Sequence, residues 1–198
     1  METSPEAHPS NSRWTAFLSC LEGPLRSIRY ASLEDAPKLA ERVRIWLIAQ
    51  GVVSATPCQA PGAENLLSRG PSAAAWDAYL HTSPVLMCGL EVTTQRQVFH
   101  TGDNGIDSIR CPDCGVRRNP DDLPWSDAVG AWFEDDGNYC MKCPDCGASR
   151  SIVEWEFDHP WGFGNLAFGF WNWPITDRMM VEISAITGNR CRLVHEHI

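Results

Sequence analysis

Three features of the sequence predict an α+β fold. Near each end of the chain, a Ser or Thr precedes an amphipathic segment that stops at a glycine and leads into a strand, from Ser32 to Gly51 and from Thr176 to Gly188. Between these ends, the pentapeptide Cys-Pro-Asp-Cys-Gly occurs twice. We therefore expect strand-helix-strand units at both ends and an inserted metal-binding subdomain at about residues 108–157. Residues 1–12 predict a disordered tail, and residues 13–198 a single domain.

The first helix is predicted to begin at Ser32, with Asp35 three positions later in a weaker form of the capping box. Gly51 suits the residue that ends a helix in the left-handed conformation. A short strand over residues 25–30 precedes this helix, and Val52 opens the next strand. The apolar face has helical periodicity, is widened by Ile45 and Ile48, and comprises Ala36, Leu39, Ala40, Val43, Trp46 and Leu47.

The middle of the chain is less regular. Residues 54–72 contain several Pro and Gly residues and predict a loop. A second helix is expected from Ser72 to about Leu80, and alternation of apolar and polar residues predicts strands over 90–100 and 152–157. The last elements are a helix between Thr176 and Gly188 and a strand over 191–197.

The repeated pentapeptide predicts a structural metal site. Two cysteines with two residues between them can bind one ion if the chain turns tightly, because Pro fixes φ after the first cysteine and Gly permits a positive φ after the second. Backbone N–H groups in such a turn can stabilise the charge on sulfur. The segment between the copies has its own helical pattern, which places on one face Trp125, Ala128, Val129, Trp132 and Phe133.

Other roles for these cysteines remain open at this point. A redox Cys-x-x-Cys motif usually occurs once rather than twice, and structural disulfides require an oxidising compartment. A site with four sulfur ligands also suits iron. Cys140 lacks the flanking Pro and Gly, so we expect a buried thiol or a thiol near the site rather than a ligand.

This part of the chain resembles the zinc-ribbon family, in which two Cys-Pro-x-Cys-Gly turns lie at the tips of antiparallel hairpins. The resemblance covers about residues 108–157, and the segment between the turns is longer than in the shortest ribbons. It implies an inserted zinc-ribbon subdomain with one structural Zn²⁺, and as its ligands Cys111, Cys114, Cys143 and Cys146.

The charge of the chain favours a basic partner. The formal net charge is −9, and most of it falls after residue 110. Surfaces that bind phosphate need clustered Lys and Arg, so nucleic acid is the less suitable partner. Asp135 and Asp136 are candidates for contacts with a basic protein. The chain shows no signal region and no apolar run long enough for a membrane span, so we expect a cytoplasmic protein without a membrane partner.

Eight aromatic residues lie between Trp155 and Trp173. They suit a hydrophobic core, and alternatively a stacking groove for a peptide, sugar or base. Trp161, Trp171 and Trp173 are expected to be the most exposed of the eight and are the candidates for partner binding. Asp158 and His159 could form an acid/base pair, although a turn is the simpler interpretation.

The run from Phe163 to Pro174, with the helix-Gly-Val-Val segment and the Cys-Pro-x-Cys pair, is similar to a group of small bacterial proteins. Some of these are labelled as sugar-transport ATPases, but this chain has no Gly-x-x-x-x-Gly-Lys-Ser/Thr motif. Three hypotheses for function follow. The first is an acidic interaction module, in its sharpest form an inhibitor or immunity-type protein that covers a basic partner. The alternatives are a transcription-associated or nucleic-acid-binding ribbon protein and an enzyme that uses an aromatic cleft at 155–173.

Overall fold

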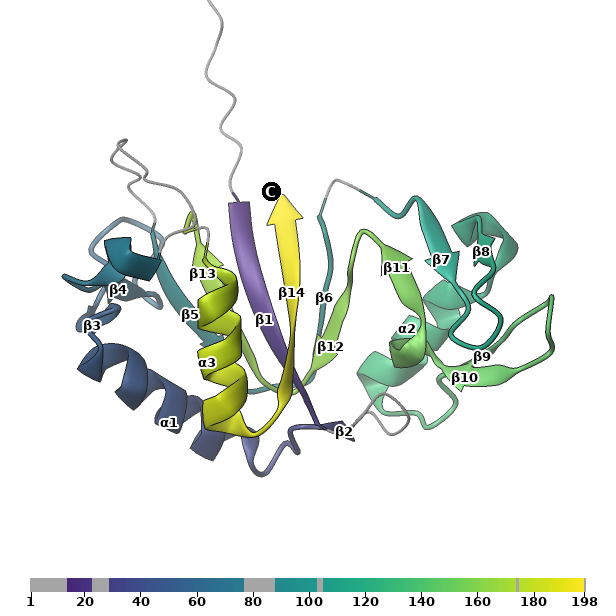
Figure 1. The fold of residues 1–198 in the computed structure, drawn as a ribbon, viewed down its shortest axis with the longest axis horizontal. Helices are drawn as coiled ribbons and strands as arrows, with labels where there is room; N and C mark the ends of the chain where they lie inside the picture. Colours follow the sequence, from purple (N-terminus) through teal and green to yellow (C-terminus); the bar gives the residue numbers. More distant parts are fainter. Residues whose placement is uncertain (1–13, 23–28, 77–87, 103–104, 174, 198) are drawn as a thin grey trace, which may run out of the picture.

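A computed structural model describes residues 14–22, 29–76, 88–102, 105–173 and 175–197, and the chain is an α+β protein. Figure 1 shows two lobes side by side. We call the first the sheet lobe; it contains the main antiparallel sheet with helices α1 and α3. We call the second the metal lobe; it contains helix α2 and the short strands β7 to β11.

The main sheet brings the two ends of the chain together. Its strand order is β14-β1-β13-β5-β4-β3, with β2 added alongside β1, and all its pairings are antiparallel. The last strand runs beside the first, from the pair Trp14–His197 to the pair Leu21–Arg190. The strands are β1 (Trp14–Glu22), β2 (Arg29–Tyr30), β3 (Val53–Pro57), β4 (Leu67–Arg69), β5 (Gly89–Thr93), β13 (Ala167–Trp171) and β14 (Arg190–His197).

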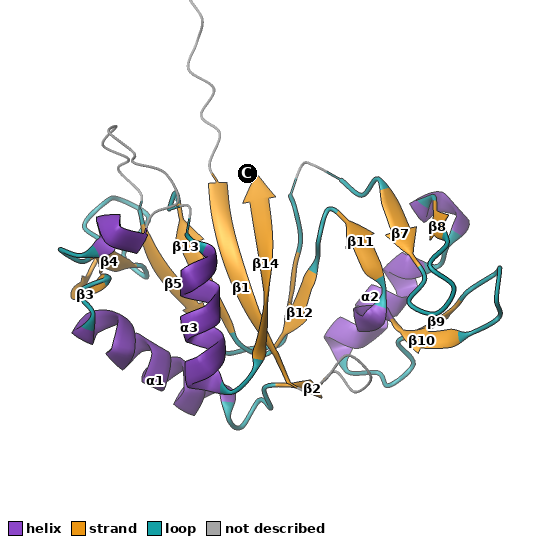
Figure 2. Ribbon diagram, in the orientation of Figure 1, coloured by secondary structure: helices purple, strands orange, loops and turns teal. Residues whose placement is uncertain are grey.

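Helices α1 (Ala36–Ala49) and α3 (Asp177–Thr187) cover one face of this sheet (Figure 2). Gly51 after α1 and Gly188 after α3 both have positive φ, which a glycine adopts without steric cost. A short 3₁₀ helix (Ala73–Trp76) completes this layer. The core between the helices and the sheet is built mainly from apolar side chains, of which the largest include Leu47, Leu90, Phe168, Phe170, Trp173 and Ile183.

The opposite face of the sheet meets the strand pair β6 (Gln97–Phe99) and β12 (Gly162–Gly164), which lies between the lobes in Figure 1. Phe99 packs there against Ala167 and Val194. Two arginines add polar links: Arg96 donates to the backbone oxygen of Trp132, and Arg192 to that of Trp161. The two lobes therefore share a packed and hydrogen-bonded boundary.

The metal lobe has short strands and a second apolar core. Strand β7 pairs with β8 and β11, and β9 pairs with β10. Its core holds Trp132, Met141, Trp155, Phe157 and Phe163. The elements are β7 (Ser108–Arg110), β8 (Arg117–Arg118), α2 (Trp125–Glu134), β9 (Cys140–Lys142), β10 (Ser149–Ser151) and β11 (Glu156–Asp158), with 3₁₀ helices at Pro120–Asp122 and Ile152–Glu154.

Several sequence predictions are confirmed. The two terminal helices, their glycine stops, the helix after the first pentapeptide and the last strand all form. Ser32 accepts a hydrogen bond from the Asp35 N–H as a cap would, although α1 itself begins at Ala36. Among the described residues, no helix combines the length and apolar character needed to cross a bilayer. The predicted tail lies outside the described residues.

Other predictions are wrong. Residues 54–72 contain most of β3 and all of β4 rather than a continuous loop, and 90–100 forms two strands rather than one. The strand predicted over 152–157 begins instead as a 3₁₀ helix. Only residues 73–76 of the helix expected from Ser72 are helical, and residues 77–80 are not described. Ile45 and Phe133, placed on buried helical faces, are 56% and 50% exposed.

Candidate metal centre

Four cysteine sulfurs converge between the two hairpin turns of the metal lobe. One turn joins β7 to β8 and the other joins β9 to β10. The Sγ atoms of Cys111 and Cys146 are 3.9 Å apart, and those of Cys114 and Cys143 are 3.8 Å apart. All four sulfurs lie within 4.8 Å of one another. None of these four cysteines forms a disulfide, so this cluster is a group of possible ligand atoms and not a pair of disulfides.

The spacing of the sulfurs fits a tetrahedral metal ion. A bond of about 2.3 Å from zinc to each of four sulfurs places the sulfurs about 3.8 Å from one another. The cross-turn distances of 3.8 and 3.9 Å match that value. Cys111 and Cys143 are buried, whereas Cys114 and Cys146 are exposed. The cluster could therefore hold one ion at the surface of the lobe, with the buried pair fixed by the core.

The two turns have the same backbone geometry. In each turn the glycine donates its N–H to the first cysteine's carbonyl, from Gly115 to Cys111 and from Gly147 to Cys143, both at 3.0 Å. The φ angles of these glycines are +73° and +74°, which a residue with a side chain rarely adopts. The sequence Cys-Pro-Asp-Cys-Gly thus builds two equivalent halves of one site.

The environment of the thiols favours a bound cation. Backbone N–H groups of the second turn, first that of Cys146, lower the pKa of Cys143 to about 7 and favour its thiolate. At Cys114 the N–H of Val116 acts in the same direction, but desolvation and the neighbouring sulfurs outweigh it and raise the pKa to about 12. Four crowded sulfurs cannot all carry charge alone. A dication among them removes this conflict and lets all four ionise.

Two arginines connect the turns to each other. Arg150, which follows the second turn, binds Asp113 of the first turn through two hydrogen bonds of 2.6 and 2.7 Å. Arg118, which follows the first turn, binds Asp145 of the second in the same two-pronged way. Each arginine lowers the pKa of the carboxyl that it binds. Each of the two ion pairs therefore connects one turn to the other, as a metal ion bound by all four cysteines would.

Sequence reasoning missed these arginines, although the chain carries a signal for them. The repeat extends beyond the pentapeptide to Cys-Pro-Asp-Cys-Gly-x-x-Arg, at residues 111–118 and 143–150. The arginine is the eighth residue of each copy. Because the two halves face each other, the arginine of one copy reaches the aspartate of the other.

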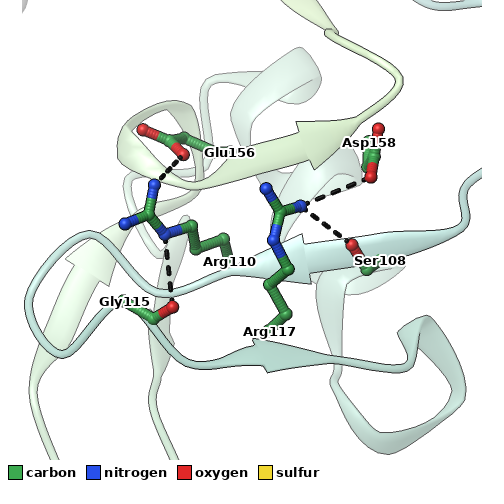
Figure 3. Close-up of polar contacts among 6 residues, drawn as sticks. All are labelled: Ser108, Arg110, Gly115, Arg117, Glu156 and Asp158. Carbon is green, nitrogen blue, oxygen red and sulfur yellow. Dashed lines mark hydrogen bonds and ion pairs between the residues drawn. The ribbon is translucent and has the colours of Figure 1, made fainter.

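The remaining arginines of this hairpin are also paired with carboxylates, as Figure 3 shows. Arg110 donates to Glu156 at 3.1 Å and to the carbonyl of Gly115 at 3.2 Å. Arg117 donates to Asp158 at 3.3 Å and to Ser108 at 3.2 Å. These contacts join β11 and β7 to the first turn. They also occupy Asp158, which was considered as half of an acid/base pair with the exposed His159.

The residues predicted to bind a partner are not gathered in one place. Trp173 is 1% exposed and Trp161 9%, so their predicted exposure is wrong. Trp171 is partly buried and donates its Nε1–H to Glu91 at 2.8 Å. The core interpretation of the aromatic stretch is confirmed for Trp161 and Trp173, which belong to the cores of the two lobes, and of the three candidates Trp171 is the one that stays partly exposed.

The acidic candidates lie at the surface. Asp135 and Asp136 are exposed at the end of α2, and Asp135 forms an ion pair with Arg96 at 2.6 Å. Cys140 is exposed, so of its two predicted placements the buried one is wrong, and it does not belong to the cluster of four sulfurs.

The fold and the site define an α+β protein with a four-cysteine cluster suited to a metal ion. In comparisons with protein-family models, curated proteins and solved structures, nothing matches the chain. The resemblance to zinc ribbons therefore stays a prediction that rests on the turns themselves.

Proposed function

We propose that this chain is a zinc-stabilised interaction module whose acidic surface binds a basic protein. Its form would be a zinc ribbon inserted between the strand-helix-strand ends of an α+β domain. The observation that carries the proposal is the surface at the end of α2, where Phe133, Glu134 and Asp136 are all exposed. We call these three residues the α2-end patch. A reducing compartment such as the cytoplasm suits the free thiols.

Zinc is the metal proposed for the four-cysteine cluster. Closed sites with four cysteines in tetrahedral geometry are most often structural zinc sites, and zinc has no redox chemistry that would damage its thiolates. Iron is the alternative, since it accepts the same ligands. Elemental analysis of protein purified without chelators should find one equivalent of zinc. A visible absorption band with one equivalent of iron would favour the alternative, and no metal would contradict the proposal.

The distribution of charge argues for a basic partner. Arg110, Arg117, Arg118 and Arg150 of the metal lobe are each paired with a carboxylate. The paired carboxylates offset their positive charge, so these arginines form no basic patch of the kind that a phosphate backbone needs. Further acids at both ends of α2 are exposed and enter no ion pair within the described residues: Asp121, Asp122, Asp127, Glu134 and Asp136.

The acidic residues at the end of α2 do not stabilise the helix. The C-terminus of a helix carries a partial negative charge, so Glu134 and Asp136 oppose the helix dipole there. Phe133 is 50% exposed beside them, and leaving a large apolar side chain in water also gives no stability to the fold. A partner with a basic surface and an apolar recess would compensate for both costs.

The experiment compares capture of partners by the native chain and by a patch variant. Native lysate is passed over immobilised protein, and the retained proteins are then titrated individually. Glu134→Lys with Asp136→Lys should abolish binding of a basic protein, whereas Glu34→Lys, an exposed acid on the sheet lobe, should not. Retention of only acidic proteins, or equal binding by the patch variant, would contradict the proposal. Salt-dependent binding of DNA or RNA would favour the nucleic-acid alternative instead.

A further inference from the structure

The two edges of the main sheet differ in how they are protected. Strand β3 forms one edge, contains Pro57 and pairs irregularly with β4. Strand β14 forms the other edge, contains no proline and pairs with β1 in regular register along eight residues. A long regular edge is a template for a further strand, whereas proline and irregular pairing prevent such an addition. Among the described residues, no strand pairs with the outer edge of β14.

The outward backbone groups of β14 follow from its pairing with β1. The N–H of Cys191 donates to the Ser184 hydroxyl of α3 at 3.2 Å, so it points away from β1. Successive residues of an antiparallel strand turn their backbone groups to alternate sides, so the N–H and C=O groups of Leu193 and His195 also point outward. Within the described part of the chain, these outward groups form no hydrogen bond. The open part of the edge therefore runs from Leu193 to the exposed His195.

Both faces of β14 are covered, so the edge is the side that stays open. Cys191 belongs to the core under α1 and α3, and Val194 packs on the other face against Phe99 of β6. Beside this edge, α3 exposes an apolar side chain, because Val181 is 62% exposed. Val181 lies three residues before Ser184, which reaches the edge, so the two side chains are neighbours on the helix surface.

The side chains of β14 are complementary to a second copy of the same strand in antiparallel orientation. Arg192 and Glu196 lie at equal distances on either side of Val194, and the three share one face of the strand. Antiparallel pairing of two copies about Val194 places Arg192 opposite the partner's Glu196. It also places Leu193 opposite the partner's His195. Side chains directly opposite each other have Cβ atoms about 5 Å apart, which permits an ion pair, and by symmetry each pair forms twice.

The backbone favours this register over its neighbour. The outward groups of Leu193 meet those of the partner's His195, and such a pair exchanges both of its N–H···O bonds. Pairing about Leu193 instead would place His195 opposite the partner's Cys191, whose N–H is already bound to α3. Arg192 donates to the backbone oxygen of Trp161 at 3.0 Å, and its guanidinium has further N–H donors for a carboxylate.

We propose that β14 pairs with β14 of a second copy of this chain, so that two main sheets join about a two-fold axis at Val194. Such a contact uses the same surface on both copies. Glu196 lines a cavity of about 300 Å³ together with Glu91 and forms no ion pair within the described residues, so the partner's Arg192 supplies its cation. The proposal is independent of the α2-end patch, which lies on the other lobe.

The test is sedimentation equilibrium of the full chain at about 1–100 μM in about 0.15 M salt, which measures micromolar dissociation constants. The native chain should reach twice the mass of one chain. Glu196→Arg and Arg192→Glu each place like charges opposite each other twice, so each should weaken the dimer about tenfold or more. Glu34→Arg is the matched control, since it reverses an exposed acid elsewhere on the sheet lobe, and it should dimerise like the native chain.

A mixture of the two variants gives the decisive result. The Glu196→Arg chain carries arginine at both positions and the Arg192→Glu chain carries glutamate at both, so every pair across a mixed dimer is complementary again. The mixture should therefore dimerise more tightly than either variant alone, which a misfolded variant cannot do.

A native chain that stays monomeric at about 100 μM, or a mixture that binds no more tightly than the separate variants, overturns the proposal. If the native chain is monomeric, slow hydrogen exchange at the His195 amide would assign the edge to another segment of this chain. None of these results affects the test of the α2-end patch.

Discussion

The two lobes are held together by different forces. The sheet lobe has its longest strands, β1 and β14, paired along eight residues, and a mainly apolar core under two helices. The metal lobe has strands of two or three residues, and four arginine–carboxylate pairs connect its hairpins. Short hairpins have little independent stability. The metal lobe therefore adds ion pairs and a cysteine cluster that could bind a metal to its own apolar core, while the sheet lobe depends mainly on burial.

This difference makes metal removal the largest perturbation. Cys143→Ser, or treatment with a strong chelator, should unfold the metal lobe, because the free energy of binding zinc in such sites is on the order of 10 kcal/mol and is coupled to folding. Hydrogen exchange should increase over β7 to β11 while β1, β13 and β14 stay protected. Protection lost equally in both lobes would show that they unfold as one unit.

Cys140→Ser is the control for this experiment. Cys140 lies only three residues before Cys143 but is exposed and outside the cluster. The variant should keep one equivalent of metal and native protection in both lobes. Loss of metal from it would make Cys140 a ligand after all.

Two core truncations with the same expected loss of folding free energy compare the two lobes. Phe168→Ala in the sheet lobe and Trp132→Ala in the metal lobe each remove a fully buried ring. Each should lower the free energy of unfolding by about 3–5 kcal/mol. We expect only Trp132→Ala to release metal more readily, measured by the rate of zinc transfer to a chromogenic chelator. Equal rates of zinc transfer from both variants would contradict the expectation that only the core of the metal lobe controls how firmly the metal is held.

What the sequence could predict follows the same division. The cluster of four cysteines was predictable because the pentapeptide specifies its own turn, and the glycines after α1 and α3 likewise act locally. The strands within residues 54–72 could not be predicted from the sequence, because the Pro and Gly residues that suggest a loop are required there by contacts with distant parts of the chain. Pro57 lies on β3, at the edge of the sheet. A Cβ at position 70 would lie 2.2 Å from the backbone oxygen of Gly51. Gly70 is therefore required for the close approach of two backbone segments and does not mark a loop.

The errors in burial also have non-local causes. Helical periodicity places Ile45 and Phe133 beside buried faces, but only the final packing decides how wide each face is. Glu91 and Glu196 gave no sequence signal, because they line one cavity only through the strand order that places β5 and β14 in the same sheet. Sites built from a local turn can be predicted from sequence, and sites built by sheet topology cannot.

A smaller effect is expected from the ion pairs that cross the metal centre. Asp113→Arg with Arg150→Asp exchanges the partners, whereas either single change places like charges together. Each single variant should release zinc faster than the native chain, and the double variant should recover part of the native rate. Because the pair is exposed, high salt should reduce all these differences. A double variant no better than the single ones would show that the geometry of the pair matters and not its charge.

The smallest predicted effect concerns an ionisable residue of the sheet lobe, whose stability is expected to come mainly from burial. The folded-state pKa of Glu196 is raised above its ordinary value of 4.5, mainly by desolvation. Between the ordinary and the raised pKa, the folded chain binds more protons than the unfolded chain, so Glu196 makes the fold less stable as pH rises through that window.

Glu196→Gln should therefore be slightly more stable than the native chain above the raised pKa and equally stable below 4.5. Thermal unfolding of the dilute, monomeric chain from pH 4 to 8 gives the comparison, and Asp127→Asn controls for the loss of net charge. A Glu196→Gln variant that is less stable at pH 8 would show that Glu196 already has a stabilising contact in the folded chain, and the sheet lobe would then depend on charge as the metal lobe does.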